Sequence, residues 1–86
     1  MRAKRPAVVR QVSRGAVLLR LWRGRMELTQ REAADMIGVD FVQWSKFECG
    51  AVKPGRKNAA AIAALTKGDV YLESWDENSA AARKAS

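Results

Sequence analysis

The 86-residue sequence contains no histidine and a single cysteine, Cys49. These two residue types supply most transition-metal ligands, and histidine is the commonest acid–base catalyst. We therefore expect no cofactor and no metal site, and an enzyme is the weakest functional hypothesis because no catalytic constellation is visible. A lone cysteine cannot form an internal disulfide, which is typical of a cytoplasmic protein.

Long apolar runs are absent as well. No stretch approaches the ~20 residues of a membrane-spanning helix, and the N-terminus lacks the apolar core of a signal peptide. Acidic residues are outnumbered, with 9 Asp and Glu against 16 Lys and Arg, giving a net charge of +7. Basic chains attract polyanions. The composition therefore predicts one small cytoplasmic domain whose partner is a nucleic acid and not a membrane.

The most informative stretch covers residues 28–50. Thr29 and Glu32 have the spacing of a capping box, which predicts a helix beginning at Gln30. Gly38 can adopt a positive φ at low cost and suits a sharp reversal. An apolar face at helical spacing is formed by Ala33, Ala34 and Ile37.

A second short helix is expected over residues 41–49, capped by Asp40. Trp44 and Phe47, three residues apart, should point inward. The positions left facing outward are Phe41, Val42, Gln43, Ser45 and Lys46. Two short helices joined by a tight turn form a helix-turn-helix, whose geometry suits DNA recognition.

Two further helices flank this unit. The first is expected over about residues 16–25, and the last over residues 58–65. Their predicted inward positions are Val17, Leu18, Leu21 and Trp22 in the first, and Ala61, Ile62 and Leu65 in the last. The predicted fold class is all-α.

These residues resemble the Cro and lambda-repressor type of DNA-binding domain, the family that includes the xenobiotic-response-element type regulators. The matching positions are Leu19, Arg23, Thr29-Gln30, Ala34, Gly38-Val39-Asp40, Ser45-Lys46, Glu48, Gly50, Pro54, Ile62 and Leu65. They cover roughly residues 17–65. The resemblance implies a compact four- to five-helix lambda-repressor-like domain, with an ion pair between Arg23 and Glu48.

The resemblance also implies which residues contact base edges: Phe41, Val42, Gln43 and Lys46. The Gln43 amide can pair with adenine, and Lys46 can donate to guanine or a phosphate. Phe41 departs from the glutamine that is frequent at this place in the family. It either packs on thymine methyl groups or folds back onto the preceding helix or into a protein interface.

A second set of residues is expected to contact phosphates: Arg14, Thr29, Gln30, Arg31, Ser45, Lys53, Arg56 and Lys57. Helix N-termini and basic loops beside a DNA-contacting helix commonly do so. The alternative is that these residues are only helix caps and solvated charges.

The termini leave alternatives open. Residues 1–14 form a basic arm that either tracks DNA phosphates or contacts nothing specific, and residues 15–68 form the DNA-binding domain. Residues 69–78 are expected to be extended, with a strand over residues 70–75. Its dimer candidates are Val70, Tyr71, Leu72 and Trp75, although Tyr71 and Trp75 could instead fold onto their own domain. Residues 79–86 are a tail, either a frayed helix or disordered.

The function expected from the sequence is sequence-specific binding of double-stranded DNA by a homodimer on a palindromic operator. The chain would act as a phage- or plasmid-type transcriptional repressor or autoregulator. The main alternative is the DNA-binding antitoxin of a toxin–antitoxin pair, with a toxin as protein partner. A basic module that binds RNA or another protein is a weaker alternative, because RNA binders usually expose aromatic platforms.

Overall fold

The computed structural model describes residues 12–77. Four α-helices and one short 3₁₀ helix follow one another, and this part of the chain contains no β-strand. The elements are α1 (Arg14–Arg25), α2 (Gln30–Ile37), α3 (Phe41–Cys49), α4 (Arg56–Leu65) and η1 (Leu72–Asp76). The predicted all-α class is confirmed. The expected basic arm, apart from residues 12–14, and the expected tail at 79–86 lie outside the described residues.

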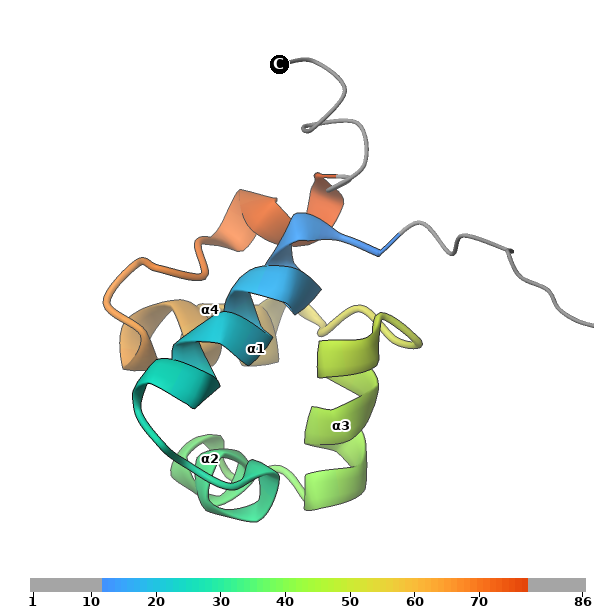
Figure 1. Cartoon of the computed structure of the whole chain (residues 1–86). Helices are drawn as coiled ribbons and strands as arrows, with labels where there is room; N and C mark the ends of the chain where they lie inside the picture. The colour runs from blue at the N-terminus through green and yellow to red at the C-terminus, as the bar shows by residue number, and fades with distance from the viewer. Residues whose placement is uncertain (1–11, 78–86) are drawn as a thin grey trace, which may run out of the picture.

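The helices surround one apolar core. α3 stands at the edge of the molecule with α2 at its N-terminal end, and η1 lies beside the start of α1 (Figure 1). The largest fully buried side chains are those of Leu19, Trp44, Phe47, Ile62 and Val70. These side chains come from α1, α3, α4 and the segment before η1. α2 contributes the small Ala33 and Ala34, which are also buried, so all four α-helices share one core.

The predicted apolar stripe of α1 is wrong at two positions. Val17 and Leu21 are 38% and 56% exposed, whereas Ala16, Leu19 and Trp22 are buried. Residues at spacings of three face the core here, and Val17 with Leu21 lies on the neighbouring face. The sequence pattern is ambiguous because α1 is apolar on both faces, and only packing against α3 and η1 selects one of them.

The predicted strand at residues 70–75 is also wrong. The chain turns after α4 and forms η1, in which the Ser74 N–H donates to the Tyr71 carbonyl at 3.0 Å. The Val70 N–H donates to Thr66 Oγ1 at 3.0 Å. Two N–H groups that a strand could have offered to a second chain, those of Val70 and Ser74, are thus bonded within their own chain, and the segment is not a strand.

The proposed dimer candidates are accordingly not a surface strip. Val70 is 0% exposed and Trp75 is 5% exposed, both within the core of their own chain. Tyr71 is half-buried and donates its hydroxyl proton to Glu77 at 2.6 Å, while Leu72 stays 48% exposed. This corrects the strand-pairing interface and selects, for Trp75, the alternative of folding onto its own domain.

Trp75 can pack against α1 because residue 15 is a glycine. A Cβ at Gly15 would lie 2.4 Å from the Cδ2 atom of Trp75, closer than van der Waals contact allows. The absence of a side chain lets the indole lie directly on the first turn of α1. The Arg14 N–H also donates to the Glu77 carbonyl at 2.7 Å, so η1 is joined to α1 by packing and by the backbone.

Candidate nucleic-acid interface

The helix caps and the turn glycine that the sequence predicts are present in the α2–turn–α3 unit. The Glu32 N–H donates to Thr29 Oγ1 at 3.0 Å, and the Thr29 N–H donates to Glu32 Oε1 at 2.8 Å, so the capping box is complete. Gly38 ends α2 with a φ of 76°, in the left-handed region that favours glycine. Asp40 then accepts from the Gln43 N–H at 2.8 Å and caps α3.

α3 has one buried and one exposed face. Trp44 and Phe47 are 0% exposed and anchor the helix from behind, as predicted. Phe41 is 39% exposed and Val42 is 51% exposed. Lys46 is also exposed, while Gln43 is half-buried at the edge of this face. The helix therefore presents two apolar side chains and a cation to solvent.

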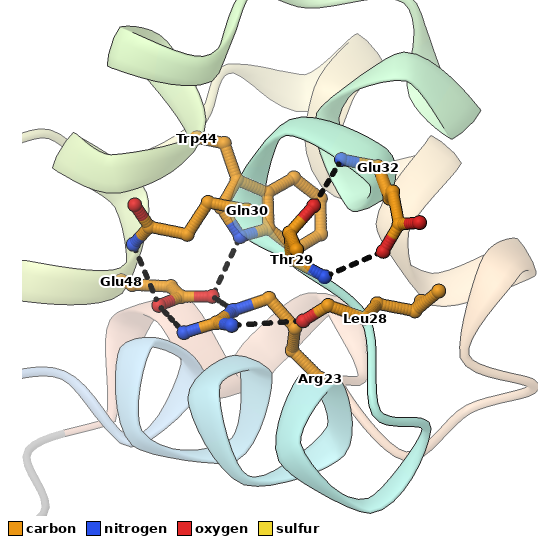
Figure 2. Close-up of polar contacts among 7 residues, drawn as sticks. All are labelled: Arg23, Leu28, Thr29, Gln30, Glu32, Trp44 and Glu48. Atoms are coloured by element: carbon orange, nitrogen blue, oxygen red, sulfur yellow. Dashed lines mark hydrogen bonds and ion pairs between the residues drawn. The ribbon is translucent and has the colours of Figure 1, made fainter.

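Glu48 is the polar centre that joins α1, α2 and α3 (Figure 2). Its carboxylate accepts two hydrogen bonds from the Arg23 guanidinium, one of them at 3.0 Å from Nη2. It also accepts from Trp44 Nε1 at 2.6 Å and from Gln30 Nε2 at 3.1 Å. Arg23 in turn donates from Nη1 to the Leu28 carbonyl at 2.9 Å. The predicted Arg23–Glu48 pair is therefore present, and two further donors share it.

The environment of Glu48 has two opposing effects on its pKa. Burial raises it, because the ionised form loses hydration, while the hydrogen bonds from Arg23, Trp44 and Gln30 lower it. The donors prevail, so the pKa of Glu48 lies below the ordinary carboxyl value. The same hydrogen bond from Arg23 to Glu48 raises the pKa of the arginine. Glu48 is thus held as a carboxylate behind the exposed face of α3.

The predicted phosphate contacts divide into paired and unpaired cations. Arg14 lies 3.0 Å from Glu77, and Lys53 is paired with Asp76. Among the described residues no carboxylate pairs with the exposed side chains of Arg31, Arg56 and Lys57.

Two of the three uncharged members of the predicted set, Thr29 and Gln30, have hydrogen-bond partners within the chain. Thr29 caps α2, and one amide proton of Gln30 is committed to Glu48. Ser45 is half-buried. The structure brings Thr29, Gln30 and Arg31 together at the N-terminus of α2, and places Arg56 and Lys57 at the N-terminus of α4.

Cys49 lies on the exposed face of α3 but is not among the residues that the sequence predicts to contact DNA. Its side chain is exposed, and it follows Val42 and Lys46 at spacings of seven and three along α3. Residues at these spacings share one face of a helix. The spacing alone would have placed Cys49 on the face with Val42 and Lys46.

No protein-family model, curated protein or solved structure matches this chain. None of the helices in residues 12–77 has the length and apolar character needed to cross a membrane. Over the same residues, no group of three or more carboxylate or thiol side chains forms a potential metal site.

Proposed function

We propose that this protein binds double-stranded DNA in a sequence-specific manner through α3. The observation that supports this most is the two-faced build of that helix. The buried face of α3 carries Trp44, Phe47 and Glu48, which fix the helix to the core. Its exposed face carries Phe41, Val42 and Lys46. A short helix fixed in this way can enter the major groove, where each base pair offers a distinct pattern of donors, acceptors and methyl groups.

The charge of the surroundings supports the same proposal. The N-terminus of α2 combines free backbone N–H groups with the exposed Arg31, and the N-terminus of α4 does so with Arg56 and Lys57. Helix N-termini with nearby cations hold phosphates. Such contacts on both sides of α3 would set its position on the duplex, while α3 itself would select the sequence.

The proposal includes two copies of the chain on one palindromic operator and a role as transcriptional repressor or autoregulator. One short helix contacts few base pairs, and a second copy doubles the number of contacts. Half-sites would then be separated by about one helical turn, ~34 Å. Footprinting should show two protected half-sites at this spacing, and a single protected half-site would contradict the dimer.

The test of DNA recognition begins with selection of a preferred duplex from a random pool by the full chain. Gln43→Ala and Lys46→Ala should each weaken binding to that duplex by roughly 1–3 kcal/mol, with the fold unchanged in circular dichroism. The matched control is Lys67→Gln, which removes one exposed charge in the connection after α4, on the opposite side of the molecule from α3 (Figure 1). Equal losses for Lys46→Ala and Lys67→Gln would show non-specific charge attraction and refute the proposal.

A further inference from the structure

The side chains of Arg31 and Phe41 form a cation–π contact between α2 and α3. The Arg31 guanidinium carbon lies over the Phe41 ring, 4.9 Å from its centroid. Arg31 is the second residue of α2, and Phe41 is the first residue of α3. The contact therefore lies at the N-terminal end of α3, where helices of this kind of unit contact bases.

The ring holds the guanidinium without occupying its donors. A cation over an aromatic face is attracted by the ring quadrupole, and within residues 12–77 Arg31 makes no side-chain hydrogen bond or ion pair. Its five N–H groups are thus available to a ligand. A pre-positioned guanidinium loses less freedom on binding than a solvated one and matches the O6 and N7 acceptors of guanine.

Phe41 and Val42 add an apolar surface next to this donor. Phe41 is 39% exposed and Val42 is 51% exposed, and neither side chain can hydrogen-bond to a base. The one apolar group that the major groove offers is the C5-methyl group of thymine. The guanidinium covers one face of the ring, which leaves the ring edge and Val42 for such a contact.

We propose that Arg31 and Phe41 act together as a specificity-determining pair that recognises a guanine next to a thymine in the major groove. Arg31 donates to guanine O6 and N7, and Phe41 with Val42 packs on the thymine methyl group. Arg31 is then a base-contacting residue and not only a phosphate contact. The inference rests on the proposed function, because it applies only if α3 enters the major groove.

Two base analogues test the pair one atom or group at a time. In the selected operator, 7-deazaguanine removes only the N7 acceptor, and deoxyuridine removes only the thymine methyl group. At the contacted positions we expect about a fivefold loss of affinity for the first, at the low end for a base contact. We expect about a fourfold loss for the second, the equivalent of one buried methyl group.

Variants assign each effect to a side chain. Arg31→Lys keeps the charge but lacks the planar fork, so it should lose the sensitivity to 7-deazaguanine, and Phe41→Ala should lose the sensitivity to deoxyuridine. Arg56→Lys is the matched control and should keep both sensitivities. If Arg31→Lys and Phe41→Ala bind the selected operator with both sensitivities intact, the inference is overturned while the proposed function stands. If the wild-type chain selects no operator at all, both are overturned.

Discussion

Trp44 and Trp75, two of the three buried tryptophans, are held in the same core in different ways. Trp44 in α3 donates its indole N–H to Glu48 at 2.6 Å, within a polar centre that also holds α1 and α2. Trp75 in η1 is buried too, but its indole N–H finds no acceptor within residues 12–77. It is held by its packing on Gly15 and by an edge-to-face contact with Phe47, at a centroid distance of 6.4 Å.

Glu48 and Trp75 therefore have different roles: the hydrogen bonds at Glu48 orient α3, and the packing of Trp75 stabilises the core. The hydrogen bonds at Glu48 are directional, and their donors Arg23, Gln30 and Trp44 lie in α1, α2 and α3. They therefore fix the orientation of α3 relative to the other two helices. Packing at Trp75 has no such direction, but it removes a large apolar area from water and closes the core over α1. We therefore expect changes at Trp75 to affect mainly global stability, and changes at Glu48 to affect stability and the position of α3.

The largest effect is expected for Trp75→Ala. Removing a buried aromatic side chain typically costs about 3–5 kcal/mol, and the cavity would open between α1, α3 and η1. Leu72→Ala is the matched control in the same segment, since Leu72 is 48% exposed and should change stability by less than about 0.5 kcal/mol. Urea unfolding of both variants measures this. If Leu72→Ala lowered the free energy of unfolding more than Trp75→Ala, residues 70–75 would again be candidates for an intermolecular surface.

A smaller loss is expected for Glu48→Ala. Removing one partner of a buried ion pair costs about 3 kcal/mol or more, with the lower value expected because the Arg23 side chain is still 22% exposed. The indole N–H of Trp44 would also lose its acceptor. Asp35→Ala, which removes an exposed carboxylate of α2, is the control. Besides unfolding, operator affinity should fall for Glu48→Ala and stay constant for Trp75→Ala at temperatures where both are folded.

The same contrast explains how much of the structure follows from the sequence. α2 and α3 begin and end at the predicted residues, because their caps are local: Thr29 with Glu32, Gly38, Asp40 and Gly50 all act within a few residues. The Arg23–Glu48 pair was anticipated only from the family resemblance. Of the two added donors, Trp44 lies four residues before Glu48 on α3, a spacing that brings two side chains of a helix together. Gln30 comes from α2, and its contact with Glu48 could not be inferred from spacing along either helix.

The sequence predicts a strand over residues 70–75, and the structure differs for a physical reason. Their β-favouring side chains are typical of a strand, but the partner of Trp75 is Gly15, 60 residues earlier in the chain. Nothing near Trp75 in the sequence indicates that a glycine in α1 leaves room for an indole. Val17 and Leu21 were misassigned for a related reason, because both faces of α1 are apolar and the choice between them depends on η1 and α3.

The smallest effect concerns pH. Because the pKa of Glu48 is lower in the folded chain than in the unfolded chain, its contribution to stability is complete above the ordinary carboxyl pKa of about 4.3 and is lost as the pH falls through the folded value. Glu48→Gln removes this titration while leaving the other carboxylates in place. The stability difference between the wild type and Glu48→Gln, measured by urea unfolding from pH 7 to pH 3, should therefore shrink toward low pH. A difference that stays constant over this range would show that hydrogen bonding to Trp44 and Gln30, and not the charge of Glu48, holds the three helices together.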